Sequence, residues 1–231
     1  MSPFAVKCER PQVKICGLTR VDEALACAAA GADAVGCVFY PKSPRFVTTS
    51  RAEEIRQALE RKVTVVGVFV DAPDHEILRI RDRTGIDAVQ LHGREPPEQV
   101  ERLVSEGLLV VKALFANTDP SPADAERYPA GAFLVECAGG PLPGGNALAW
   151  DWAAAKPLAA RYPLVIAGGL TADTVFRALL SSGADAVDVS SGVELAPGRK
   201  SPDLVAAFID EVARCADRLP ETTQRTRRIF P

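Results

Sequence analysis

Short apolar runs alternate with longer amphipathic stretches along almost the whole chain. The apolar runs, rich in β-branched residues, cover residues 13–15, 34–39, 64–70, 88–91, 109–114, 132–135, 164–167 and 186–189. Each run is short and nearly continuous, as in parallel strands that are buried on both faces. Helical periodicity covers residues 21–30, 51–61, 73–84, 96–106, 123–128, 152–160, 172–182 and 202–216. The pattern therefore predicts eight strand–helix units.

One short sequence motif, the glycine–aspartate phrase, occurs three times where a predicted helix ends and the next strand begins. Glycine, any residue, Asp, Ala and Val stand at 31–35, 85–89 and 183–187. Glycine is common just past a helix because it adopts a left-handed backbone without strain. Eight units in 231 residues favour an α/β fold with a single (β/α)8 TIM barrel over a doubly wound open sheet. No linker divides the chain, so we expect one barrel domain over 1–231, with a flexible polar C-terminal tail at about 218–231.

Composition and charge exclude several classes of function. The chain is 47% hydrophobic and 25% charged, which is typical of a globular protein. Its net charge of −3, without a long basic stripe, argues against nucleic-acid binding. No apolar stretch is as long as a membrane span, and the first residues lack the apolar core of a signal peptide. We expect a cytoplasmic protein with no nucleic-acid or membrane partner.

The cysteines and histidines do not suggest a metal site. The six cysteines, Cys8, Cys16, Cys27, Cys37, Cys137 and Cys215, show no CxxC pairing and no regular ligand spacing. The chain has two histidines, His75 and His92, and so few imidazoles argue against a histidine-based metal site. Without an export signal, the cysteines are interpreted as free thiols in a reducing compartment.

Cys16 ends the first apolar run, directly before a glycine and a helix. The carboxyl ends of parallel strands are where ligands bind and where catalytic side chains project. A thiol at that position is a candidate base or nucleophile. The alternative is a small buried hydrophobic residue, which is what most cysteines are. The position at a strand end favours the chemical role.

Two glycine turns follow the last two predicted strands. They contain Gly168 and Gly169 in the first turn, and Ser191 and Gly192 in the second. Exposed N–H groups near helix N-termini bind anions, and barrels commonly bind phosphate after these two strands. Ordinary tight turns are the alternative. Two such turns at the expected strands favour a phosphate site.

Three more side chains follow strands and are candidates for the same site. Arg45 lies in a proline-stiffened loop and would suit a carboxylate, although it could be a solvated arginine. His92 lines the site or packs internally. Glu136 ends the sixth run, where an apolar mouth would favour a general acid; alternatively it is a surface carboxylate. A glycine-rich loop at 138–148 follows it and could close over a substrate.

The motifs in this order resemble the phosphoribosylanthranilate isomerase family of tryptophan biosynthesis. The resemblance covers nearly the whole chain. Its most specific segments are KICGLT at 14–19, FYPKSPR at 39–45, GVFVD at 67–71, QLHG at 90–93, IAGGL at 166–170 and VDVSSGVE at 187–194.

The resemblance implies a monomeric or homodimeric barrel that needs no cofactor and acts on a small phosphorylated substrate. Its reaction is the Amadori rearrangement of N-(5-phosphoribosyl)anthranilate. The resemblance further implies that Cys16 is the general base and that Glu136, at the end of the sixth strand, is the general acid. Arg45 would hold the anthranilate carboxylate, and the two glycine turns would hold the phosphate.

The chain departs from the family pattern near the acid. The family usually carries aspartate where Glu136 stands, and a glycine and a lysine are missing from the loop that follows. A displaced carboxyl could slow proton transfer, which depends on hydrogen-bond reach. Two alternatives therefore stay open. One is a paralogue acting on a related phosphosugar adduct with altered chemistry, and the other is a non-catalytic barrel that binds phosphorylated ligands.

Overall fold

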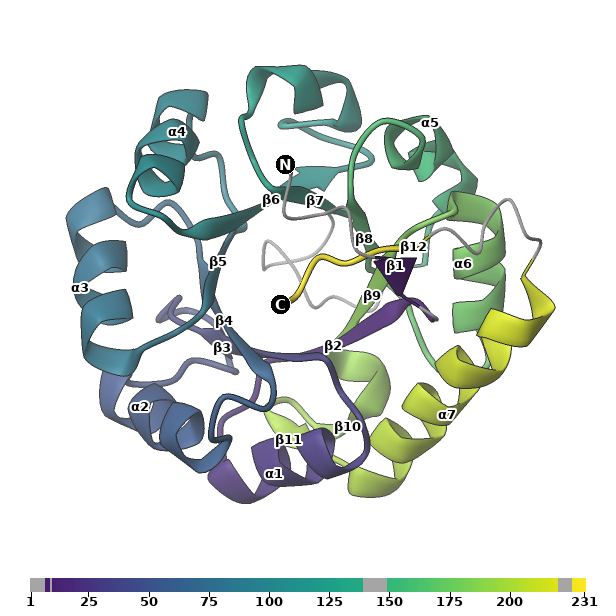
Figure 1. Ribbon diagram of the computed structural model, residues 1–231, viewed down its shortest axis with the longest axis horizontal. Helices are drawn as coiled ribbons and strands as arrows, with labels where there is room; N and C mark the ends of the chain where they lie inside the picture. The colour runs from purple at the N-terminus through teal and green to yellow at the C-terminus, as the bar shows by residue number, and fades with distance from the viewer. Residues whose placement is uncertain (1–6, 9, 139–148, 220–225) are drawn as a thin grey trace.

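Eight parallel strands close into a barrel in chain order (Figure 1). The structure is a computed structural model that describes residues 7–8, 10–138, 149–219 and 226–231. The barrel strands are β2 (Gln12–Cys16), β3 (Ala34–Val38), β4 (Thr64–Phe69), β5 (Ala88–Leu91), β6 (Leu109–Phe115), β7 (Ala132–Glu136), β8 (Leu164–Ile166) and β9 (Ala186–Val189). β2 pairs with β9, which closes the sheet. The predicted (β/α)8 barrel is confirmed, and the open sheet is excluded.

Helices surround this barrel on its outer side (Figure 1). They are α1 (Val21–Ala29), α2 (Thr49–Ala58), α3 (Asp74–Thr84), α4 (Pro97–Ser105), α5 (Lys156–Ala159), α6 (Val175–Ser182) and α7 (Pro202–Arg218), with 3-10 helices η2 (Pro122–Arg127), η3 (Trp152–Ala155) and η4 (Ser191–Val193). None of the described helices has the length and apolarity to cross a bilayer.

Two predicted helices do not form a continuous α-helix. The stretch 123–128 forms the 3-10 helix η2, which begins at Pro122 and is followed by Pro129. The stretch 152–160 divides into η3 and the four-residue α5. Pro157 lies near the start of α5 and has no N–H to bond back into the preceding turn, so a continuous α-helix cannot form there.

The repeated glycine–aspartate phrase joins neighbouring strands at their beginnings. Gly85 and Gly183 end α3 and α6 with φ values of 68° and 67°, the left-handed conformation expected of a glycine at this position. The aspartate of each phrase accepts a hydrogen bond from the backbone of the strand before it. These bonds run from Val13 to Asp33, from Val65 to Asp87 and from Leu164 to Asp185, at 2.7, 2.9 and 2.9 Å. Strand starts are therefore tied in pairs.

Small side chains occupy the base of the barrel interior. The first residue of every second strand is a fully buried alanine, namely Ala34, Ala88, Ala132 and Ala186. Barrel interiors are usually filled by layers of bulky side chains, so four alanines leave space. Ile229 and Phe230, near the end of the chain, join the same buried cluster. The C-terminal segment thus fills a barrel base that the strands themselves leave open.

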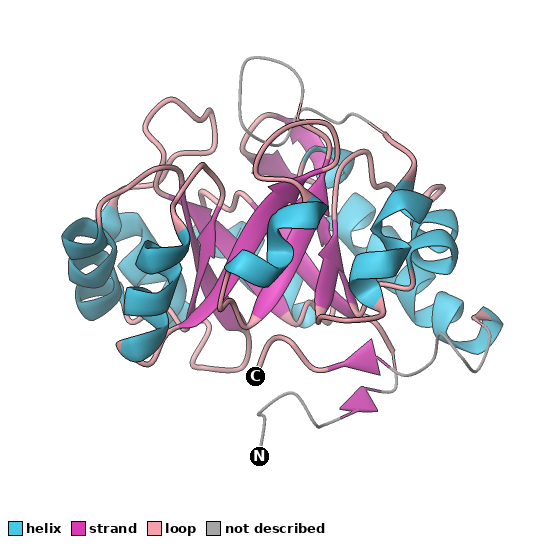
Figure 2. Ribbon diagram, turned by 90° about the horizontal axis from the view of Figure 1, so that it is seen from above, coloured by secondary structure: helices cyan, strands magenta, loops and turns pink. Residues whose placement is uncertain are grey.

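The C-terminal segment is held at this base by specific contacts. β12 (Thr226–Arg227) pairs antiparallel with β1 (Lys7–Cys8), below the barrel (Figure 2). The Gln12 side-chain oxygen accepts hydrogen bonds from the N–H groups of Ile229 and Phe230, at 2.7 and 2.9 Å. Its amide nitrogen donates to the Phe230 carbonyl at 2.8 Å. The prediction of a flexible polar tail is wrong for residues 226–231, because two apolar residues at their end find a cavity to fill.

Candidate active site

The predicted acid and base lie on the same rim of the barrel. Cys16 is the last residue of β2 and Glu136 is the last residue of β7. All eight strands are parallel, so their carboxyl ends form one mouth. Because β8 and β9 separate β7 from β2 in the closed barrel, the two residues belong to well-separated parts of this rim. They are placed to reach a bound molecule from different sides.

The Cys16 side chain is buried beside a charged pair. It packs with Val38 and is 8% exposed. Lys14 is two residues earlier on the same strand, and its ammonium donates to an Asp188 carboxylate oxygen at 2.8 Å. On β3, Gly36 is the register partner of Cys16, and an added Cβ there would lie 2.7 Å from the sulfur. The glycine leaves the space that the thiol occupies.

The groups around Cys16 and Lys14 shift the pKa values of both side chains. Burial raises the pKa of the Cys16 thiol, although the Lys14 ammonium opposes this rise. Burial opposes the charge on Lys14 in turn, but the neighbouring Asp188 carboxylate keeps the pKa of Lys14 above its ordinary value. At neutral pH Cys16 is therefore mainly a thiol, and Lys14 is an ammonium able to stabilise a thiolate once one forms. Sequence reasoning identified Cys16 but missed both charged neighbours.

Arg45 lies at the mouth, but its guanidinium is already paired. The Nε and Nη2 groups of Arg45 donate to the two carboxylate oxygens of Glu194 at 2.9 and 2.7 Å, and the Arg45 residue is 7% exposed. Lys200 donates to the same carboxylate at 2.7 Å. A Cβ added at Gly17, next to Cys16, would collide with Cδ of Arg45. Arg45 is thus not a solvated surface residue, and its contact with a substrate carboxylate remains a prediction.

A short hairpin supplies the partners of Arg45. β10 (Glu194–Ala196) and β11 (Arg199–Lys200) pair antiparallel, which brings Glu194 beside Lys200. Burial works against ionisation of Glu194, yet the hydrogen bond from Arg45 and the charge of Lys200 hold its pKa below the ordinary value. The charged group at the mouth is therefore fixed by its own ion pairs. Sequence reasoning missed Glu194 and Lys200 as partners.

Glu136 is buried and bonded to His92. Its carboxylate oxygen lies 2.7 Å from Nε2 of His92, and the Glu136 residue is 6% exposed. The other ring nitrogen, Nδ1, lies 2.8 Å from the amide nitrogen of Gln90. The ring also meets Phe115 edge-on, with centroids 5.7 Å apart. The structure therefore excludes a surface carboxylate and brings together Glu136 and His92.

A fully buried ion pair holds the backbone around His92. Lys112 and Glu95 lie 3.0 Å apart, and both side chains are 0% exposed. Lys112 also donates to the carbonyls of Leu91 and Gly93 at 3.3 and 2.8 Å, and Glu95 accepts the N–H of Gly93 at 3.0 Å. Both neighbours of His92 are thus fixed. This pair was missed in the sequence, although a lysine inside an apolar strand was a visible signal.

The glycine turn after β8 presents backbone N–H groups. Gly168 and Gly169 have φ values of 81° and 68°. The indole N–H groups of Trp150 and Trp152 donate to the carbonyls of Ala167 and Gly168 at 3.0 and 3.1 Å. Among the described residues, no backbone acceptor is bonded to the N–H of Gly168 or Gly169. The carbonyls are bonded to the indoles, and the two N–H groups are candidates for binding an anion.

The second glycine turn lies against the first. η4 follows β9, and the first turn of a helix leaves its N–H groups without helical partners, here those of Ser191 and Gly192. A Cβ added at Gly192 would collide with the carbonyl of Leu170, which follows the first turn. The close approach requires glycine. The two predicted turns are brought together, as one anion pocket needs.

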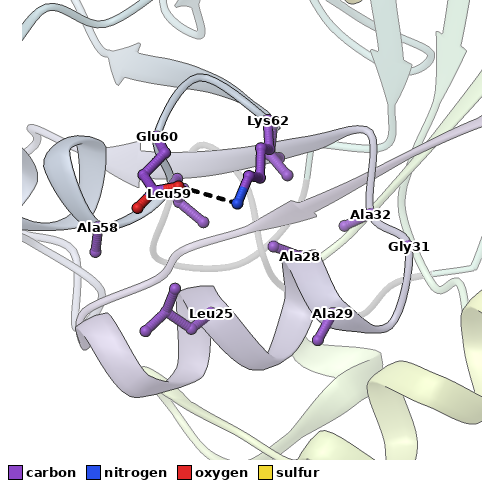
Figure 3. A pocket seen from close by; sticks show the side chains of 10 residues that line it. Leu25, Ala28, Ala29, Gly31, Ala32, Ala58, Leu59, Glu60 and Lys62 are labelled. Carbon is purple, nitrogen blue, oxygen red and sulfur yellow. Dashed lines mark ion pairs between the residues drawn. The ribbon is translucent and has the colours of Figure 1, made fainter.

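A separate hollow lies on the outer side of the barrel (Figure 3). It encloses about 530 Å³ between α1 and the turn after α2, and its lining includes Leu25 and the ion pair between Glu60 and Lys62. None of the predicted site residues lines it. Within the described ranges, no group of three or more metal-ligating side chains is clustered. Apart from Ala138, the glycine-rich loop expected to close over a substrate lies outside the described residues.

Sequence comparison identifies close relatives over most of the chain. A family model described as N-(5'phosphoribosyl)anthranilate (PRA) isomerase matches residues 13–211. The N-(5'-phosphoribosyl)anthranilate isomerase of Desulfatibacillum aliphaticivorans is 50% identical over 203 residues, which cover 88% of this chain and 93% of the relative. The enzyme of the same name from Rubrobacter xylanophilus is 46% identical, covering 86% of this chain and 97% of the relative.

Solved structures agree with this similarity. The crystal structure of phosphoribosyl anthranilate isomerase from Thermus thermophilus superposes with a TM-score of 0.80 at 38% identity, covering 88% of this chain and 98% of its own. A phosphoribosyl anthranilate isomerase in complex with reduced 1-(o-carboxyphenylamino)-1-deoxyribulose 5-phosphate has a TM-score of 0.76 at 36% identity, covering 88% and 99%.

Proposed function

The chain belongs to the N-(5'-phosphoribosyl)anthranilate isomerase family, and from this premise we propose that Cys16 and Glu136 carry out the family's reaction. The reaction is the Amadori rearrangement of N-(5-phosphoribosyl)anthranilate to 1-(2-carboxyphenylamino)-1-deoxyribulose 5-phosphate in tryptophan biosynthesis. The observation that carries the proposal is the placement of a buried thiol and a buried carboxyl at the ends of separate strands on one rim.

Glu136 acts first, as the general acid. Its carboxyl group gives a proton to the ribose ring oxygen while the bond from C1 to that oxygen breaks. The lone pair of the anthranilate nitrogen forms the C=N bond, which leaves a protonated Schiff base. Acid catalysis of this kind contributes roughly 10²- to 10⁴-fold to a rate. Glu136 is 6% exposed, so its carboxyl group is largely shielded from bulk water.

Cys16 acts second, as the general base. Its thiolate takes the proton from C2. The electrons of the C–H bond form a double bond between C1 and C2, and the π electrons of the C=N bond return to nitrogen, which gives an enolamine. The enolamine then tautomerises to the ketone, with the hydroxyl proton at C2 lost and a proton gained at C1. Because burial raises the pKa of the Cys16 thiol, the adjacent Lys14 ammonium is what favours the thiolate.

The rest of the mouth binds the two charged ends of the substrate. The N–H groups of Gly168, Gly169, Ser191 and Gly192 hold the phosphate; the close approach of the two glycine turns supports this assignment. Arg45, fixed by Glu194, presents the remaining edge of its guanidinium to the anthranilate carboxylate. A small phosphorylated substrate fits these groups, and a monomer or homodimer remains the prediction for the assembly.

The test is turnover of freshly prepared N-(5-phosphoribosyl)anthranilate, followed by the loss of its fluorescence. We expect wild-type protein to turn it over and Cys16→Ser and Glu136→Gln each to lower kcat by about 10³-fold. Thermal melting establishes that each variant is folded. Wild-type turnover that survives both substitutions would show a different acid and base. Absence of wild-type turnover, together with failure to complement an auxotroph for this step, would instead favour a paralogue or a binding barrel.

A further inference from the structure

Glu136 is the end of a chain of three buried polar side chains. The amide nitrogen of Gln90 is hydrogen-bonded to Nδ1 of His92, and Nε2 of His92 is hydrogen-bonded to a carboxylate oxygen of Glu136. Gln90 lies in β5 and Glu136 in β7, while Phe115 of the intervening strand β6 is the register partner of Glu136 and packs on the imidazole. The chain therefore spans three neighbouring strands along the mouth.

The backbone that carries His92 is fixed on both sides of the residue. Its own N–H donates to the carbonyl of Phe69 at 2.8 Å. The buried pair of Lys112 and Glu95 binds the groups of Leu91 and Gly93 that flank it. A residue held this tightly positions its partner within the few tenths of an ångström that proton transfer requires.

Hydrogen-bond roles along the chain give Glu136 two matched states. When the Gln90 amide nitrogen donates to Nδ1 of His92, the ring proton lies on Nε2, which donates to an ionised Glu136. The Gln90 oxygen is buried with no hydrogen-bond partner among the described residues. Rotating the amide by half a turn places that oxygen at Nδ1, so that Nδ1 carries the proton and Nε2 accepts one from a protonated Glu136.

We propose that His92 and Gln90 are positioning residues that hold Glu136 in both of its protonation states. The inference rests on the proposed role of Glu136 as the acid. It explains how this chain uses a glutamate where its family usually carries an aspartate, because the bond to His92 fixes the longer side chain. His92 then acts through Glu136, while the direct substrate contact predicted from the sequence stays untested.

The experiment measures kcat and KM separately in purified full-length variants. We expect His92→Leu to lower kcat about 100-fold and Gln90→Met to lower it about tenfold, with KM within about twofold of wild type in both. His92→Gln, which keeps a donor near the position of Nε2, restores kcat to within about tenfold of wild type. The matched control is Gln99→Met, because Gln99 is also buried and makes one amide bond, to the Ala72 carbonyl, outside the chain of Gln90, His92 and Glu136.

A double substitution separates this inference from the proposed function. In a Glu136→Gln background, His92→Leu should cause no further loss of kcat, since both residues act on the same proton. The inference is overturned if Glu136→Gln is inactive while Gln90→Met and His92→Leu match the Gln99→Met control. It is also overturned if the losses from His92 and Glu136 multiply. If Glu136→Gln keeps full activity, the proposed acid itself is wrong. If His92→Leu fails to fold, the kcat values of Gln90→Met and His92→Gln still test the positioning roles of Gln90 and His92.

Discussion

The two ends of this barrel bury different kinds of side chain, polar and charged at one end and apolar at the other. At the mouth, buried ionic or polar groups cluster around Cys16, Arg45 and Glu136, each of them held by another strand or loop. At the base, Ile229 and Phe230 pack against a layer of alanines and fill the space that these small side chains leave. Buried charges are retained at a cost in desolvation, whereas buried apolar surface stabilises directly. The mouth therefore gathers buried groups that cost free energy to desolvate, and the base supplies part of the stability that the mouth does not.

The largest expected effect on this comparison comes from replacing Lys112, whose charge is fully buried below the mouth. Lys112→Met leaves Glu95 without a counter-charge in the interior, and we expect the free energy of unfolding to fall by about 3–5 kcal/mol. Urea titration measures it. The control is Lys62→Met, which removes an exposed partner of Glu60 and should leave the urea midpoint unchanged. Equal midpoints for the two variants would mean that the buried pair does not hold the structure.

Phe230 tests the base. Phe230→Ala should lower the free energy of unfolding by about 3 kcal/mol, because it empties the space between the alanines. At temperatures where the variant is folded, kcat/KM should equal that of wild type. Leu195→Ala is the control, since that side chain is 74% exposed and its loss should leave stability within about 0.5 kcal/mol of wild type. A fall in kcat/KM on emptying the base would show that the two ends are coupled.

The smallest expected effect is the part of the pH dependence of stability that Cys16, at the mouth, contributes. Burial raises the pKa of Cys16, so the folded state favours the protonated thiol. The resulting stability is fully present below the ordinary thiol pKa of about 9 and is lost as pH rises above it. Relative to Cys16→Ser, wild type should lose up to about 1.4 kcal/mol per pH unit in that range. Other buried thiols occur in both proteins and cancel. Identical pH slopes would contradict the shift, and Phe230→Ala should show the wild-type slope.

Much of the fold could be predicted because its signals are local. Apolar runs and glycines that end helices lie within a few residues of each other, and they indicated all eight barrel strands correctly. The C-terminal segment was misjudged because its cavity is made by four alanines on strands distant in sequence. Ile229 and Phe230, two apolar residues after a polar stretch, were the only local signal.

The positions of the candidate site residues in the fold were predictable one by one, but their contacts were not. Cys16 and Glu136 end apolar runs, and this placed them at the mouth. Lys14 and Lys112 interrupt such runs with a charge, a signal that was visible and not used. Their partners come from remote strands and loops, so only the closed barrel identifies them. The paired state of Arg45 was hidden for the same reason.

The three aspartate bonds at the strand starts link neighbouring strands in pairs. They fasten β2 to β3, β4 to β5 and β8 to β9, while Gly131 stands before β7 and leaves the pair β6 and β7 without this bond. The backbone of the same aspartates continues the connection to the next pair, because the carbonyls of Asp33 and Asp185 accept hydrogen bonds from the N–H groups of Thr64 and Gln12, each at 3.1 Å. One short motif thus fastens each strand start to the strands on both of its sides.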